Sequence, residues 1–230
     1  MADHRLPGSP EVALTLRRSG RARRISLRVS QLDGRVTLTL PRGVSEAEAL
    51  EFASSKAEWI RGHLDKQPHA VAIGIGSDLT VDGVTCRIVE GSGRRVISRN
   101  GEIQVPFEQA AIRLQAWLKA RARDRLVASA DRYAERLGQS YSRVTIRDTR
   151  SRWGSCSSQG ALMFSWRLIL APPPVLDYVV AHEVAHLAEL NHSPAFWETV
   201  ERIYGPYRDP RQWLRDNGPQ LHRYRFEERV

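Results

Sequence analysis

The residues best suited to chemistry lie in one short run, His182-Glu183-Val184-Ala185-His186. On an α-helix, residues four apart lie on one face, with their Cβ atoms about 5–6 Å apart. Two imidazoles at that spacing can reach one zinc ion at about 2.0–2.1 Å. Glu183 sits one step round the helix, where its carboxylate can contact a metal-bound water without being a ligand. The run therefore predicts a zinc-dependent hydrolase, most simply a metalloprotease, in which Glu183 is the general base.

The residues around this run indicate a packed helix, because an apolar stripe formed by Leu176, Val179, Val180 and Leu187 flanks it. Burying two histidines and a glutamate in such a helix is costly without a partner. Ordinary surface or core histidines are the alternative, and this context disfavours them.

A zinc site needs a third protein ligand. His192 follows His186 closely, and Asn191 between them can end the helix in a left-handed conformation that turns the next residue toward the metal. The alternative is a glutamate from the following helix, Glu198 or Glu201, as in zinc peptidases with two His and one Glu. We favour His192, which leaves one position for water.

The wider segment resembles the YgjP-like metal-dependent hydrolases, relatives of the SprT-like zinc metallopeptidases. The matching elements are Arg150-x-Arg152-Trp153-Gly154-Ser155-Cys156, Ser165-Trp166-Arg167-Leu168, Asp177-Tyr178-Val179-Val180 and His192-Ser193-x-x-Phe196-Trp197. The last element is similar to the SprT-like pattern, in which a histidine after the helix completes the zinc site. The resemblance is strong over residues 110–225. It implies a zincin-like domain, bound zinc and peptidase-type hydrolysis. The metzincins share the histidine spacing, but Glu189 stands where they have glycine and no methionine follows Met163.

Several polar residues near the motif are candidates for substrate binding or support. Arg150, Arg152 and Arg167 could hold a substrate carboxylate or stabilise an oxyanion, or could simply pair with Asp148, Asp177 or Glu189. Asp177 and Glu189 are also candidates to orient the ligand imidazoles. Candidate oxyanion donors are Tyr178, Tyr204 and Tyr224. The strand at 161–165 could offer an edge to an extended peptide.

The charge balance favours acidic partners, because 35 basic and 26 acidic residues give a formal net charge of +9. The densest basic cluster consists of Arg17, Arg18, Arg21, Arg23, Arg24 and Arg28. Such a face is ordinarily just solvated, yet it also has the character of a phosphate-binding surface. We therefore expect a peptide or protein substrate, and nucleic acid is a candidate partner for the basic N-terminal face.

Composition excludes several classes of protein. The chain has 230 residues, 41% of them hydrophobic, which suffices for a real core. Two cysteines are too few for a disulfide scaffold. The sequence offers neither an apolar run long enough to span a membrane nor an apolar signal core at its start. We expect a cytoplasmic protein without a membrane partner.

The pattern of apolar residues predicts an α+β protein. Residues 1–10 read as a loose tail, and alternating runs from Glu11 to Pro106 read as short strands, interrupted by a helix that begins at Ser45. A long helix is expected at 109–137, strands at 144–147 and 163–170, and helices from Val175 and Ser193. These elements indicate a basic β-rich region at 1–108 and a zincin-like metallopeptidase domain at 109–230.

Two other functions remain open on the sequence. The same zinc site could hydrolyse a bond other than a peptide bond. Alternatively, the chain could be a nucleic-acid-associated protein whose metal is structural. A structural zinc site has four protein ligands, whereas a catalytic one has three and a water. The number of ligands therefore separates these hypotheses.

Overall fold

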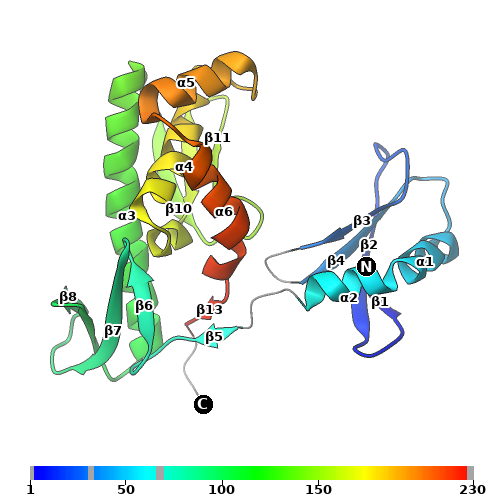
Figure 1. Ribbon diagram of the computed structural model, residues 1–230, viewed down its shortest axis with the longest axis horizontal. Coiled ribbons are helices and arrows are strands. Elements are labelled where there is room, and N and C mark those ends of the chain that lie inside the picture. Colours follow the sequence, from blue (N-terminus) through cyan, green and yellow to red (C-terminus); the bar gives the residue numbers. More distant parts are fainter. Residues whose placement is uncertain (1–2, 31–33, 66–69, 227–230) are drawn as a thin grey trace. The chain divides into compact units, whose positions relative to one another are not determined.

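The computed structural model describes residues 3–30, 34–65 and 70–226. The chain forms two compact units, Met1–His69 and Ala70–Val230. Each unit has its own cluster of buried apolar side chains. Figure 1 shows the elements of both.

The first unit is a four-stranded sheet of order β1-β2-β4-β3 with two helices. Its elements are β1 (Asp3–Leu6), β2 (Val12–Arg18), β3 (Ser26–Val29), β4 (Val36–Leu40), α1 (Glu46–Ser55) and α2 (Ala57–Leu64). The loose tail expected at residues 1–10 is wrong for residues 3–6, because β1 pairs antiparallel with β2 from Asp3 to Leu6. The pair Asp33-Gly34, a sequence typical of hairpin turns, lies partly outside the described residues, since Asp33 is not described.

One face of this sheet carries the core of the first unit. Leu14, Leu38 and Leu40 are almost fully buried there, together with Ala53 and Ile60 from the two helices. The N-terminus of α1 is capped as the sequence predicts, because the Ser45 hydroxyl accepts a hydrogen bond from the Glu48 amide at 3.2 Å.

The second unit begins with another four-stranded sheet, of order β6-β7-β9-β8. Its strands are β6 (Asp78–Val81), β7 (Val84–Gly91), β8 (Ile97–Arg99) and β9 (Glu102–Pro106). Both hairpin turns have positive φ, 52° at Asp82 and 52° at Asn100, each followed by a positive-φ glycine. Asp-Gly and Asn-Gly are the residue pairs that two-residue hairpin turns of this kind favour.

We expected the boundary between the two parts of the chain near residue 108, but the compact units divide after His69. The reason is that the β6–β9 sheet shares a core with the rest of the second unit. Leu79, Ile88 and Val105 belong to the same buried cluster as Leu114 and Leu118 of the long helix. The Asp82 amide also donates to the Ile169 carbonyl at 2.7 Å.

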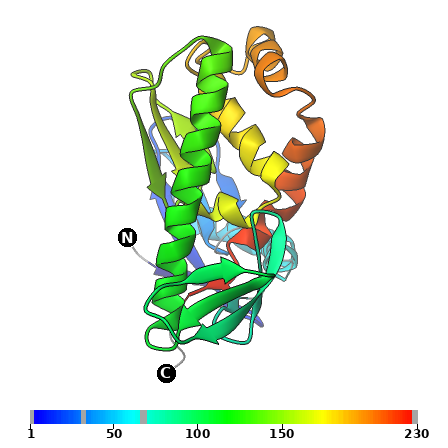
Figure 2. The same ribbon diagram turned by 90° about the vertical axis from the view of Figure 1, so that its left-hand side faces the viewer.

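The long helix α3 (Ala110–Leu137) forms one side of the second unit. It ends where the sequence predicts, at Gly138, whose φ of 69° is left-handed. Its buried stripe includes Leu118, Ala122 and Leu126. Figure 2 shows this helix in green with the shorter α4 in yellow beside it. The helix therefore provides a rigid support for the element that bears the motif.

A mixed three-stranded sheet and three further helices complete this unit. They are β10 (Arg143–Arg147), β11 (Gly154–Cys156), β12 (Ala161–Ser165), α4 (Pro173–Ala185), α5 (Pro194–Tyr204) and α6 (Arg208–Leu221). Two short strands, β5 (Val71–Ala72) and β13 (Tyr224–Arg225), pair in parallel. The fold class is α+β, as predicted. In the described part of the chain, none of the helices combines the length and apolarity that crossing a membrane requires.

The strand expected at 163–170 is only partly correct. The strand β12 ends at Ser165, and Trp166–Leu170 form a 3-10 helix in which every side chain is buried. A short run buried on all sides has no alternation, so periodicity alone does not distinguish a strand from a helical turn.

Candidate metal centre

The motif lies at the C-terminal end of α4, which ends earlier than the sequence indicated. His182 is in the last turn of the helix, and His186 is its C-cap. Tight turns follow, with the Leu187 amide bonded to the Val184 carbonyl at 2.9 Å. Asn191 is not among the residues with positive φ, so the left-handed bend expected there is wrong. Instead, its side-chain oxygen accepts a hydrogen bond from the Ser193 amide at 3.1 Å.

Three histidines converge at this end of the helix. His182, His186 and His192 each offer one nitrogen, and these nitrogens lie within 4.8 Å of one another. The Nε2 atoms of His182 and His192 are 3.0 Å apart. The expectation that His192 joins the two motif histidines agrees with this geometry. Glu198 and Glu201, the alternatives, have exposed side chains on α5 and do not belong to the group.

The environment keeps two of these imidazoles neutral. Burial, together with the neighbouring histidines and Arg211, lowers the pKa of His182 to about 3. Burial, His186 and Arg211 likewise lower the pKa of His192. Two neutral imidazole nitrogens at 3.0 Å either form one hydrogen bond or turn their lone pairs to a common cation. Because a nitrogen of His186 also lies nearby, a shared cation explains the arrangement better than a single hydrogen bond does.

His186 is held in a tautomer suited to metal binding. Its Nδ1 lies 2.8 Å from the main-chain carbonyl of Glu189, which can only accept a hydrogen bond. The proton therefore resides on Nδ1, and the Nε2 lone pair is available to a metal. Glu189 was expected to orient an imidazole, and it does so through its main chain rather than its carboxylate.

Phe196 lies beneath all three imidazoles. Its ring centroid is 4.9 Å from that of His182, 4.4 Å from that of His186 and 4.7 Å from that of His192. Ser193 places it, because the Ser193 hydroxyl caps α5 by accepting a hydrogen bond from the Phe196 amide. Nδ1 of His182 is buried and forms no hydrogen bond with the described residues. Packing therefore orients the His182 ring.

Glu183 is buried beside the histidines, with 8% of its surface exposed. Burial raises the pKa of its carboxyl to about 7, although the charge of Arg152 and a hydrogen bond from the Cys156 backbone act in the opposite direction. A carboxylate with a pKa near neutrality can both accept and release a proton at physiological pH. The hydrogen bond also ties Glu183 to β11.

The three arginines expected to contact substrate lie in different surroundings. Arg167 is buried, forms hydrogen bonds of 2.7 and 3.3 Å with both carboxylate oxygens of Asp148, and also donates to the Leu221 carbonyl. Arg167 therefore pairs with an acidic residue, which was the alternative to substrate binding, and it supports the fold. Arg152 is exposed and close enough to lower the pKa of Glu183. Arg150 is exposed and acts on the pKa of His222 instead.

The candidate oxyanion donors and the candidate orienting residue Asp177 also lie in different surroundings. Tyr178 is buried, and its ring lies 6.0 Å from that of His182. The Tyr204 hydroxyl donates to the Pro174 carbonyl at 2.8 Å, so it is occupied away from the histidines. Asp177 pairs with Arg132 at 2.9 Å and accepts from Ser129, and does not orient an imidazole.

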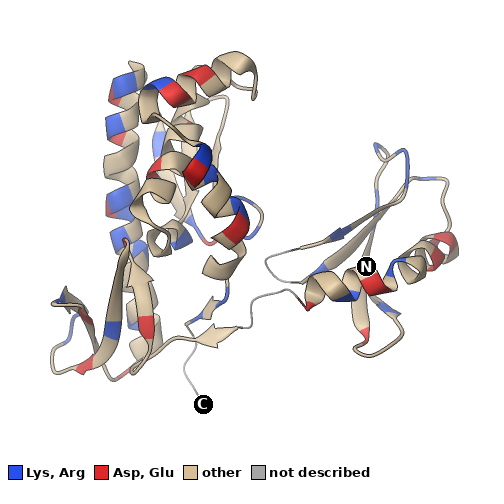
Figure 3. Cartoon of the chain, viewed as in Figure 1, with Lys and Arg blue, Asp and Glu red and all other residues tan. Residues whose placement is uncertain are grey.

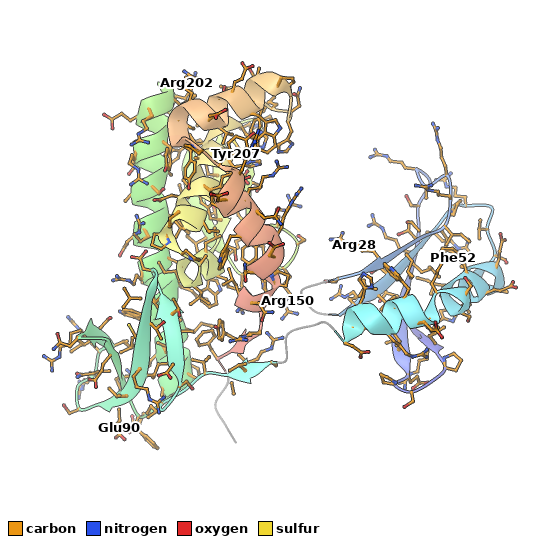
Figure 4. All side chains as sticks on the ribbon, viewed as in Figure 1. Arg28, Phe52, Glu90, Arg150, Arg202 and Tyr207 are labelled. Carbon is orange, nitrogen blue, oxygen red and sulfur yellow. The ribbon has the colours of Figure 1, made fainter. Side chains whose placement is uncertain are left out.

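Sequence reasoning missed Arg211 and Tyr207. The Arg211 guanidinium lies 4.4 Å from the ring centroid of Trp197, and that ring lies 5.7 Å from the rings of both His182 and His192. Tyr207 also stacks on Trp197, with the two ring centroids 5.1 Å apart. Figure 4 labels Tyr207 where α6 begins. Arg211 forms no ion pair with any carboxylate in the described ranges.

No local signal could have revealed these residues, because α6 carries no recognisable motif. Only the packing of α6 against α4 brings Arg211 to the histidines. The complete donor set, three imidazoles with a buried carboxylate beside them, fits a divalent metal ion that prefers nitrogen ligands.

Comparison with known proteins agrees with this description. The family model for the YgjP-like metallopeptidase domain matches residues 23–217. No curated protein matches the chain. Among solved structures, the metallopeptidase zymogen of Pyrococcus abyssi abylysin matches with 21% identity over 43% of this chain and 97% of that chain, at a TM-score of 0.37.

Proposed function

Because this chain belongs to the YgjP-like metallopeptidase family, we propose that it is a zinc-dependent peptidase with a zincin-like catalytic half. His182, His186 and His192 would hold the zinc, and Glu183 would be the general base. The convergence of three imidazole nitrogens within 4.8 Å, beside a buried glutamate, is the observation that carries this proposal.

The donor set favours a catalytic metal over a structural one. Among the residues that the structure describes, only three side chains join the group of metal-ligating atoms. A structural zinc site uses four protein ligands, whereas three leave a coordination position open. When bound, the ion supplies a Lewis acid that polarises a carbonyl and acidifies water.

Glu183 is placed to move the protons of this reaction. Its carboxylate accepts a proton from the attacking water and passes it to the leaving nitrogen. Burial raises the pKa of this carboxyl and so favours its taking up a proton, which supports its role as the proton carrier. The hydrogen bond from the Cys156 amide orients the carboxylate without neutralising it.

The substrate would lie along β11, not along the strand at 161–165 that the sequence indicated. In the order β10-β12-β11, β12 is internal and β11 is an edge. The residues on either side of β11 are bonded to the β12 side, because the Ser165 amide donates to the Trp153 carbonyl and the Ser157 amide donates to the Ala161 carbonyl. In an antiparallel pair, residues that hydrogen-bond to the partner strand alternate with residues that do not. Gly154 and Cys156 therefore turn their backbone groups away from β12. The Cys156 amide already donates to Glu183, so an extended peptide would pair with this edge through the Gly154 groups and the Cys156 carbonyl and would pass directly by Glu183.

Arg211 supports a preference for substrates with a negative group near the cleaved bond. Its guanidinium has no carboxylate partner in the described part of the chain and faces the same histidines as Trp197. A carboxylate of the substrate would supply the missing partner in a charge-assisted hydrogen bond.

Metal analysis and peptide hydrolysis test the proposal together. The purified chain should contain zinc, and it should cleave a mixed-sequence library of fluorescence-quenched peptides. Chelation should abolish cleavage, and added zinc should restore it. A fully zinc-loaded chain that leaves every peptide intact would overturn the peptidase assignment, and a chain that binds no zinc would overturn the metal assignment.

A further inference from the structure

Within the first unit, the helices cover only one face of the sheet. The side chains of Leu14 and Leu38 point to the helices and are buried. The alternate residues of the sheet point the other way and are exposed, as Arg17 on β2 and Arg28 on β3 are. Figure 4 labels Arg28 on β3 and Phe52 on the helix side of the unit.

The residues of this open face form rows of hydroxyl and guanidinium groups. Arg17 is opposite Thr39 on the neighbouring strand, and Arg28 is opposite Thr37. Thr15 continues the second row, because it is also opposite Thr37. Hydroxyl and guanidinium groups are among the side-chain donors that contact phosphate oxygens of nucleic acids.

The loop between β2 and β3 extends this basic surface. Arg21, Arg23 and Arg24 are exposed on the loop. Arg42 joins them from the segment after β4, since its Nε would lie 3.1 Å from a Cβ placed at Gly20. We define the basic face as Arg17, Arg21, Arg23, Arg24, Arg28 and Arg42.

The acids of the unit lie mainly on the helix side. The acidic residues of the helices are Glu46, Glu48, Glu51 and Glu58, and the same side also carries Lys56 and Arg61. Figure 3 shows red on α1 and α2 together with some blue, and blue on the strands and their loop. Arg18 and Arg5, outside the basic face, pair with Glu46 and Glu11. In the described part of the unit, no carboxylate pairs with an arginine of the basic face, and Asp3 is the sole acid on the strands.

We propose that the basic face binds the phosphate backbone of duplex nucleic acid without reading its base sequence. The six arginines have no acidic partner among the residues that the structure describes and repel one another, and a polyanion relieves that repulsion while releasing its own counterions. Proteins that bind single strands combine a basic groove with aromatic side chains on which the bases stack. The strands of this sheet and the loop at 19–25 contain no aromatic residue, so a duplex fits better.

The test is a titration of the full-length chain against a fluorescently labelled short DNA duplex at several salt concentrations, read by anisotropy. The variant Arg17→Gln/Arg28→Gln removes two charges from the basic face. The matched control, Arg94→Gln/Arg95→Gln, removes two exposed charges from the second unit. Thermal melts and zinc content establish that all three proteins are folded.

Binding of the parent chain should weaken linearly with log salt. The slope should become shallower by about 1.8 in the Arg17/Arg28 variant, at roughly 0.9 for each phosphate that the variant no longer neutralises, and remain unchanged in the control. A duplex of unrelated sequence should bind equally. No binding at about 50 mM salt, where phosphate contacts are strong, would overturn the proposal. Equal weakening in both variants, or a single strand bound as tightly as the duplex, would also overturn it.

Discussion

Gly154 and Glu183 approach so closely that a methyl group added at Gly154 would collide with the side chain of Glu183. A Cβ at Gly154 would lie 2.5 Å from Cγ of Glu183 and 2.7 Å from its Oε1. The backbone of β11 is therefore the wall against which Glu183 rests, and the Cys156 amide fixes its carboxylate there. Glycine is needed at this position for space, since Gly154 is not among the positive-φ glycines.

The substitution Gly154→Ala should displace Glu183 and leave the three histidines in place. We expect hydrolysis to fall by about 100-fold, because a displacement of about 1 Å at a reacting group has that effect, with zinc retained. Overpacking should also cost about 1–3 kcal/mol of stability. Gly74→Ala is the control, because nothing lies within 4 Å of its added Cβ. Full activity in Gly154→Ala would show that Glu183 need not rest against β11.

The substitution Glu183→Gln should separate catalysis from metal binding. The amide has nearly the shape of the carboxylate but cannot accept the proton of water. Turnover should therefore fall by about 10²- to 10⁴-fold, while zinc content measured by mass spectrometry stays the same. Unchanged turnover would refute the base assignment. Loss of zinc would instead assign Glu183 a role in building the site.

The third ligand can be identified by metal content. His192→Ala should lose zinc and activity together, because its Nε2 lies 3.0 Å from that of His182. Glu198→Ala and Glu201→Ala should keep the metal, because both side chains are exposed and stand outside the histidine group. Elemental analysis of the three purified variants decides the matter. Retention in His192→Ala with loss in either glutamate variant would indicate a site of two His and one Glu.

The substitution Arg211→Gln should change substrate preference more than turnover. A charge-assisted hydrogen bond is worth about 1.5–3 kcal/mol, so without it KM for carboxylate-bearing peptides should rise by roughly tenfold or more. Peptides with the carboxylate amidated should be affected little. Arg208→Gln, an exposed arginine on the same helix, is the control. Equal effects on charged and amidated peptides would assign Arg211 a structural role.

The pair formed by Asp148 and Arg167 should make stability depend on acid pH. Burial alone would raise the pKa of Asp148, but hydrogen bonds and charge from Arg167 outweigh it, so the pKa lies below its ordinary value. A lowered pKa in the folded state stabilises the protein above the ordinary value, near about 3.9, and this contribution disappears as the pH falls through the lowered pKa.

Asp148→Asn should therefore lower the stability by about 1–2 kcal/mol near neutral pH, because it removes the carboxylate that pairs with the buried Arg167, while the Leu221 and Tyr224 carbonyls still accept from it and solvent screens the half-exposed Asp148. Thermal melts of variant and parent should converge in acid. Asp78→Asn, in an exposed pair with Arg87, should cost about 0–1 kcal/mol at any pH. A constant difference across the pH range would contradict the assigned ion pair.

The sequence by itself determined the features that depend on neighbours along the chain. The helical spacing of His182 and His186, the Ser193 cap and the end of α3 at Gly138 all follow from interactions within a few residues. The resemblance to the YgjP-like family rested on such short segments as well, and the match over residues 23–217 confirms it.

Tertiary structure decided what depends on packing between distant segments. Residues 70–106 join the second unit because their apolar faces complete its core, which no local pattern reveals. Whether β11 or β12 is the edge depends on the pairing of β10 with β12 across a long connection. Arg167 and Arg211 have the same side chain, yet one is buried against Asp148 and the other faces the histidines. Their roles differ because burial and available partners, rather than residue type, determine what a charged group does.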